Sequence, residues 1–262
     1  MTEGLPIAVR WREGAATLKE RFVTAQPFPH LVLDDFLEGS VADGLLAEFP
    51  DLERMNRSRD YVFGDKRELS GIAAAGPVSH RLSAALTAPS FSTWLHLVTG
   101  YDVFIDPRFH GGGFHQGGEG SYLDLHVDFN LHPLEPTWLR RLNILIYLNR
   151  DWDESWGGHL LIKSRPEDSA TAIAPIFNRA VIMETSDRTY HGYRRITVPP
   201  GTARRSLAAY AYEEVDPTGI RRRTTQWRPE DAGVVKRVMT VPYNAVVQLK
   251  NRLLGSGTSR NR

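Results

Sequence analysis

The segment from Ser121 to Phe129 places an imidazole and a carboxylate where both could bind one metal ion. Its residues, Ser-Tyr-Leu-Asp-Leu-His-Val-Asp-Phe, alternate between polar and apolar, and this period of two predicts a strand whose successive side chains point to opposite faces. The polar face should carry Tyr122, Asp124, His126 and Asp128. A histidine and a carboxylate that converge in this way are part of a facial triad, which holds ferrous iron and leaves coordination positions open. The alternative is an ordinary half-buried strand whose polar face meets water.

A facial triad needs a second histidine from a distant strand, and the chain has nine histidines in all. His191 is the best candidate, because it follows a hydrophobic strand and a polar turn at 185–190 and should lie at a strand end on the rim of the sheet. His132 and His159 occupy a proline-containing loop and a strand that follows a turn. The histidines of the early segments are expected to be structural or on the surface: His30, His80, His96 and His110.

Arg204 and Ser206 form a second chemical unit, which begins 13 residues after His191. In a strand they share one face, as His126 and Asp128 do on theirs. A planar guanidinium beside a hydroxyl can hold a carboxylate through a bidentate pair and one further hydrogen bond. The alternative for Arg204 is a surface ion pair, a role that better suits Arg205 on the opposite face.

The composition excludes several classes of site and partner. The chain has 262 residues, with 32 Lys plus Arg against 31 Asp plus Glu, and no cysteine. The near-neutral charge predicts neither a nucleic-acid nor a membrane partner, and the lack of cysteine leaves any metal to histidine and carboxylate ligands. We find no signal-like N-terminus, and no segment approaches the roughly 18 apolar residues of a membrane span. We therefore expect a cytoplasmic protein, of an oligomeric state that the sequence does not indicate.

The elements that must position these residues are mainly strands. Short strands and turns alternate between residues 101 and 215 without helical segments between them, a pattern typical of a sandwich or barrel. Arg141–Leu148 is a nearly continuous apolar run, which predicts a central strand. The glycine-rich stretch Gly111–Gly120 lacks the phosphate-loop pattern and precedes a strand, so we expect a turn between strands there.

Helical patterns flank this core. Residues 1–100 are expected to form a helix-rich flank with a charged loop at 51–75, and residues 216–262 a hairpin and helical extension. The predicted helices are 15–22, 40–49, 78–86, 92–98, 228–238 and 243–254. The run Arg221-Arg222-Arg223 suits a solvated hairpin edge better than an anion-binding patch. The predicted fold is therefore α+β, mainly β with flanking helices, built as one structural unit around a core at 101–215.

With these features the sequence resembles the Fe(II)- and 2-oxoglutarate-dependent oxygenases of the prolyl hydroxylase-like group. The matching motifs follow the order of the family over residues 101–212: His126-x-Asp128, Ile146-Tyr-Leu-Asn-Arg-Asp-Trp152 with Gly157-Gly-His-Leu160, Phe177-Asn-Arg-Ala-Val-Ile-Met183, His191 and Arg204-x-Ser206-Leu207. The fold that the resemblance implies is a double-stranded β-helix, or jelly roll, with the metal inside one mouth. The implied cofactors are Fe(II) and the cosubstrate 2-oxoglutarate, with O₂ as oxidant.

The resemblance also implies a role for individual residues. His126, Asp128 and His191 would be the iron ligands and the catalytic centre, and Arg204 would pair with the 5-carboxylate of 2-oxoglutarate. The side chains expected to complete the cosubstrate site are Ser206, Tyr147, Gln116 and Asn143. Asn143 is included because it shares a strand face with Tyr147.

The substrate would be recognised by segments outside the core motifs, namely residues 1–100, the loop at 130–140 and the C-terminal segment. The resemblance covers these segments poorly. We expect hydroxylation of a C–H bond in a small molecule, such as an amino acid, a peptide or a secondary-metabolite scaffold, with release of succinate and CO₂. The alternatives are a protein residue of the prolyl type and, less favoured, a non-oxidative cupin-type metal enzyme, whose sites usually show His-x-His. The loop Asn130–Arg140 should start at the metal mouth. Its Trp138 would either line the substrate site together with Tyr122 or pack beneath the loop as an anchor.

Overall fold

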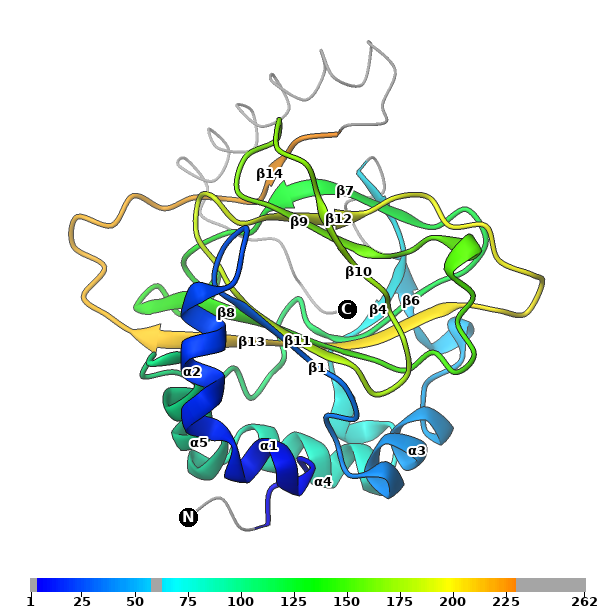
Figure 1. Cartoon of the computed structure of the whole chain (residues 1–262), viewed down its shortest axis with the longest axis horizontal. Coiled ribbons are helices and arrows are strands. Elements are labelled where there is room, and N and C mark those ends of the chain that lie inside the picture. Colours follow the sequence, from blue (N-terminus) through cyan, green and yellow to red (C-terminus); the bar gives the residue numbers. More distant parts are fainter. Residues whose placement is uncertain (1–3, 58–62, 230–262) are drawn as a thin grey trace.

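Two facing antiparallel sheets form the centre of the computed structural model, which describes residues 4–57 and 63–229 (Figure 1). The larger sheet runs in the order β1 (His30–Leu33), β11 (Ala180–Glu184), β8 (Trp138–Tyr147), β13 (Arg204–Glu214), β6 (Gly113–Gly117), β4 (Arg67–Leu69) and β2 (Asn56–Arg57), with β5 (Phe104–Ile105) paired to β13. The smaller sheet runs in the order β10 (Thr171–Ile173), β9 (Leu160–Lys163), β12 (Tyr190–Tyr193), β7 (Tyr122–Val127) and β14 (Gln226–Trp227), with β3 (Gly64–Asp65) paired to β7. The predicted class, mainly β with a jelly-roll core and flanking helices, is confirmed.

Helices cover the outer face of the larger sheet, at the bottom of Figure 1. They are α1 (Val9–Glu13), α2 (Ala15–Thr24), α3 (Gly39–Ala47), α4 (Pro77–Leu86) and α5 (Pro89–Thr99), and short 3₁₀ turns lie at Leu52–Arg54, Ile72–Ala74 and Glu154–Trp156. Proline opens α4 and α5, a position at which its missing N–H leaves no intrahelical bond unmade. Within the described ranges, no helix is long and apolar enough to cross a membrane.

Strand β8 shows why its sequence is apolar without interruption. Ile144 and Ile146 pack with the helices in the main core cluster, whereas Leu145 and Tyr147 belong to a second cluster between the two sheets. A strand buried on both faces needs apolar side chains at consecutive positions. The prediction of a central strand is confirmed, although the strand begins three residues earlier than expected, at Trp138 rather than Arg141.

The glycine-rich stretch was wrongly predicted as a turn. Residues 113–117 form β6, a buried strand between β4 and β13. Gly113 has φ +88°, and a Cβ atom there would lie 2.2 Å from the carbonyl oxygen of Leu69. Glycine is therefore required for the close approach of β4. A strand that contains several glycines has few side chains that could show the polar–apolar alternation of a strand. Its sequence therefore resembled that of a turn.

Two further predictions concern the flanks. The segment 51–75, expected to be a loop, contributes β2, β3 and β4 to the sheets. The expected C-terminal helices 228–238 and 243–254 lie outside the described residues, apart from 228 and 229. The division into a flank, a core and an extension stays a prediction.

Candidate metal and cosubstrate site

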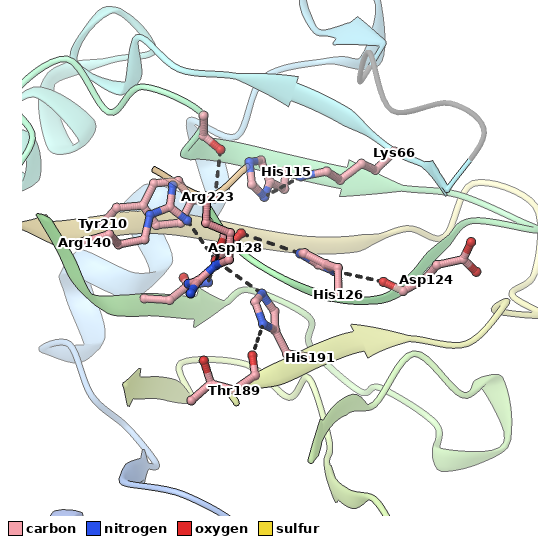
Figure 2. A network of polar contacts seen from close by, with 12 residues as sticks. Lys66, His115, Asp124, His126, Asp128, Arg140, Thr189, His191, Tyr210 and Arg223 are labelled. Carbon is pink, nitrogen blue, oxygen red and sulfur yellow. Dashed lines mark hydrogen bonds and ion pairs between the residues drawn. The ribbon is translucent and has the colours of Figure 1, made fainter. Parts of the chain in front are cut away.

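His126, Asp128 and His191 converge at one point between the sheets (Figure 2). One ligand atom from each lies within 4.8 Å of the others, and all three residues are buried. The Nε2 atom of His126 is 3.7 Å from Oδ1 of Asp128, and Nε2 of His191 is 3.6 Å from Oδ2 of the same carboxylate. His191 is the second residue of β12, close to the strand end expected from the sequence, and it pairs with His126 across the sheet.

A β-bulge brings the two histidines into register. Leu123 pairs with Tyr193 and His126 with His191, so β7 contains one residue more than β12 between these two pairs. The unbroken alternation expected from Ser121 to Phe129 is therefore wrong. Because of the extra residue, Leu123 shares the face of His126, and Tyr122 lies on the opposite face, with its ring beneath the guanidinium of Arg195 at 4.6 Å. This placement argues against the predicted contact of Tyr122 with substrate.

The ring nitrogens of both histidines are oriented for a metal. Nδ1 of His126 lies 2.9 Å from the carbonyl oxygen of Asp124, and Nδ1 of His191 lies 3.4 Å from that of Thr189. A carbonyl can only accept, so each Nδ1 carries the proton and each Nε2 keeps its lone pair for the cluster.

The protonation states also suit a divalent cation. Burial, helped by the neighbouring His191, lowers the pKa of His126 to about 3, and burial lowers the pKa of His191 as well. Burial would raise the pKa of Asp128, but the positive charge of Arg140, together with the two nearby imidazoles, lowers it overall. Neutral imidazoles and an ionised carboxylate are the forms in which these side chains bind metal, and the donor set is that of the Fe(II) facial triad. The residues therefore fit a ferrous ion.

Arg140 and Asn143 surround the carboxylate of Asp128. Arg140, 2 % exposed, forms an ion pair with Oδ2 of Asp128 at 2.8 Å, and the amide of Asn143 donates to the same oxygen at 3.4 Å. The guanidinium of Arg140 lies 3.8 Å from the ring of Phe129 and 3.7 Å from that of Tyr210. Nothing in the sequence indicated this role for Arg140. An irregularity in the pairing of β8 with β13 places Arg140 opposite Tyr212, and this register cannot be recognised from the sequence.

The second buried arginine, Arg204, has no carboxylate partner among the described residues. Its Nε donates to the carbonyl oxygen of Gly158 at 2.7 Å and its Nη2 to the hydroxyl of Tyr147 at 3.2 Å. The guanidinium lies between the rings of Tyr193 at 4.1 Å and Tyr147 at 4.9 Å, and Ser206 pairs with Tyr147 across the sheet. A buried cation without a counter-ion is costly. The site therefore fits an anionic ligand such as a carboxylate of 2-oxoglutarate.

Gln116 does not face this site, contrary to the prediction. It pairs with Arg205 on β13, whereas His115 pairs with Ser206, and paired residues of neighbouring strands point to the same side. His115 therefore takes the inner face. Its Nδ1 lies 3.3 Å from Nζ of Lys66, and its Nε2 is buried without a hydrogen-bond partner in the described part of the chain. The choice of Gln116 came from the resemblance alone, and only the register of β6 with β13 shows that its neighbour His115 takes the inner face.

Trp138 packs as an anchor rather than as part of a free lid. Its ring lies 4.8 Å from Phe104, edge to face, and 5.3 Å from His132. Arg108 lies over the same ring at 5.4 Å. These contacts favour the second of the two alternatives considered for this residue.

Replacing Trp138 with alanine is accordingly expected to lower the free energy of unfolding by up to about 3 kcal/mol, because the aromatic contacts are lost. The ratio of succinate to oxidised product should stay unchanged. Thermal unfolding and product analysis on the same variant test this, with Trp138→Phe as the control that retains most of the packing. Normal stability together with extra succinate would show that Trp138 lines the substrate site after all.

Comparison with known proteins agrees with this geometry. Residues 112–212 match the model of the 2OG-Fe(II) oxygenase superfamily, whereas no curated protein sequence matches the chain. A prolyl-4-hydroxylase from Pseudomonas putida has 15% sequence identity and a TM-score of 0.55, with 77% of this chain and 100% of that chain covered.

Two other solved structures are similar to the same extent. A Trichoplax adhaerens prolyl hydroxylase, in complex with a hypoxia inducible factor peptide fragment, has 15% identity and a TM-score of 0.55 over 78% of this chain and 92% of its own. The α-ketoglutarate-dependent epimerase SnoN from nogalamycin biosynthesis has 12% identity and a TM-score of 0.51, with 83% and 86% covered. At these identities the likeness shows a common fold. The resemblance expected from the sequence motifs is confirmed by the family model.

Proposed function

We propose that this protein is a 2OG-Fe(II) oxygenase that hydroxylates a C–H bond of a small molecule and converts 2-oxoglutarate to succinate and CO₂. The family uses Fe(II), 2-oxoglutarate and O₂. The observation that carries the proposal is the pairing of two features between the same sheets: a His-Asp-His cluster and the buried Arg204, which has no carboxylate partner among the described residues.

Each residue of the site has a distinct task in this proposal. His126, Asp128 and His191 would hold Fe(II), which when bound couples the oxidation of a C–H bond to the decarboxylation of 2-oxoglutarate. Arg204 and the hydroxyl of Tyr147 would bind the distal carboxylate of the cosubstrate. Ser206, Asn143 and His115, which project from the same face of the larger sheet, would complete the polar wall.

A small substrate is favoured by the enclosure of the metal cluster. The metal cluster is closely enclosed, since His126, Asp128 and His191 are only 5–7% exposed. Beside them, β14 pairs with the edge of β7, with Trp227 opposite His126. A residue in the middle of a long protein chain would need a groove open at both ends. Prolyl hydroxylases and SnoN have the same fold, so the fold itself allows either type of substrate.

The test is substrate-dependent succinate formation by the purified protein with Fe(II), 2-oxoglutarate and O₂. Free and N-acetylated amino acids form one panel and proline-containing peptides, capped at both ends, form the other. We expect product with an added mass of one oxygen from the first panel alone. Turnover of the capped peptides alone would establish a protein-type substrate. Absence of 2-oxoglutarate binding in the metal-loaded protein would overturn the oxygenase assignment itself.

A further inference from the structure

The arginine run 221–223 lies beside the loop that follows Asp128, and Arg223 departs from the solvated edge that was expected from the sequence, because its side chain is half-buried. The side chain of Asn130 connects the run to the loop that follows Asp128. Its Nδ2 donates to the carbonyl oxygen of Arg221 at 3.0 Å, and its Oδ1 accepts from the backbone N–H of Arg223 at 2.7 Å. Arg222 donates from Nη2 to the carbonyl oxygen of His132 at 3.1 Å. These bonds fix the run next to a metal ligand.

The three arginines differ in where their side chains lie. Arg221 and Arg222 are exposed, whereas Arg223 is half-buried. Nε of Arg223 donates to the backbone carbonyl of Asp128 at 3.2 Å, and Arg223 lies close to Asp128 and Arg140 (Figure 2). No carboxylate among the described residues forms an ion pair with it. Burial lowers the pKa of Arg223, although the charges of Asp187 and Asp128 partly offset this effect.

The charges around Asp128 do not balance. Two guanidinium groups lie beside one buried carboxylate: Arg140 forms an ion pair with the side chain of Asp128, whereas Arg223 bonds only the backbone carbonyl of that residue. Asp187 is exposed and forms no ion pair with Arg223. A metal ion on Asp128 would draw on the same carboxylate. The region is therefore left with an excess positive charge, which in a poorly hydrated site is best compensated by an anion.

We propose that Arg223 binds a carboxylate of the substrate beside the metal centre. This inference rests on the proposed function and defines the substrate class within it: a small molecule with a free carboxylate. With Nε on the backbone of Asp128, Nη1 and Nη2 remain to bind the ligand, and a guanidinium binds a carboxylate well through two parallel bonds. A single excess charge matches a carboxylate better than a doubly charged phosphate.

The experiment uses the full-length protein loaded with Mn(II), which does not turn over, and 2-oxoglutarate. The probes are N-acetyl amino acids, each compared with its N-acetyl amide, which has the same shape but lacks the negative charge. Proton relaxation of each probe by the paramagnetic ion reports binding next to the metal. We expect the acids to bind at least about tenfold more tightly than the amides, the loss that follows when one partner of a desolvated charge pair is removed.

Arg223→Gln should abolish this preference for the acids, and Arg223→Lys should retain part of it, since lysine keeps the charge but loses the planar fork. Arg221→Gln is the matched control from the same run, because the exposed Arg221 contributes only its backbone carbonyl to the contacts with Asn130, and it should leave the preference intact. Relaxation of 2-oxoglutarate in every variant shows that the fold and the cosubstrate site are intact.

Equal relaxation by acids and amides, no relaxation of any acid, or equal effects of Arg221→Gln and Arg223→Gln would each overturn the inference. If 2-oxoglutarate still relaxes in these cases, the proposed function stands and only the carboxylate assignment fails. If 2-oxoglutarate itself shows no relaxation in the unmodified protein, the proposed function fails.

Discussion

His191→Ala is expected to abolish the substrate-dependent formation of succinate. The variant would keep His126 and Asp128, but a metal ion held by two protein ligands loses both affinity and a defined geometry for its open positions. Substitution of residues that only orient metal ligands typically costs ten- to a hundredfold in metal affinity or activity, and loss of a ligand should exceed about a hundredfold. Calorimetric titration of the protein with Mn(II) measures the affinity directly, and succinate analysis measures the activity.

The control for this prediction is His96→Ala. His96 lies on the last turn of α5, is half-exposed and pairs with Asp102 on the surface at 2.8 Å. Its removal should change neither metal affinity nor turnover, and both variants should retain the circular dichroism spectrum of the parent protein. If His191→Ala bound Mn(II) as tightly as the parent, the assignment of the triad would be wrong.

Arg204→Ala is expected to raise the Michaelis constant for 2-oxoglutarate by about thirtyfold or more. Removing one member of a buried charge pair typically costs about 2–5 kcal/mol of binding free energy. Arg204 is 6% exposed, and none of its bonds in the described part of the chain goes to a carboxylate. Its charge is consequently available to the cosubstrate. Steady-state kinetics with varied 2-oxoglutarate provides the measurement.

Arg205→Ala is the matched control for Arg204, because the two residues are adjacent on β13 and point to opposite faces. The guanidinium of Arg205 lies 5.8 Å from the ring of Phe49, on the side of the helices. The control variant should leave the Michaelis constant nearly unchanged. Equal increases in both variants would mean that the effect comes from disturbance of the strand and not from a lost contact with 2-oxoglutarate.

The sequence alone was sufficient for the chemistry of the centre. Cysteine is absent, so metal ligands had to be histidine and carboxylate, and the spacing of His126 and Asp128 directed both to one side of a strand. Arg204 and Ser206 likewise follow the period of two. These predictions depend on neighbours within one strand, and local geometry determines where such neighbours point.

The tertiary structure decided which residues surround that centre. A bulge of one residue in β7 pairs His126 with His191 and moves Tyr122 to the opposite face, and no local pattern in the sequence indicates it. The same holds for β6, where pairing with β13 turns His115 rather than Gln116 toward Ser206. Because the side-chain period of a strand is two, an error of one residue in register exchanges the faces completely.

Contacts between distant segments were likewise beyond the sequence. Arg140 meets Asp128 only because β8 and the loop after β7 lie side by side, and Arg223 reaches the same aspartate from a segment more than ninety residues away in the chain. The composition of an arginine run indicates a solvated edge. Arg223 is half-buried because the folded chain offers its guanidinium the backbone carbonyl of Asp128 as an acceptor. The sequence therefore determined which atoms could bind iron and a carboxylate. Only the pairing of the strands determined which charges face them, because pairing sets side-chain direction across the sheets.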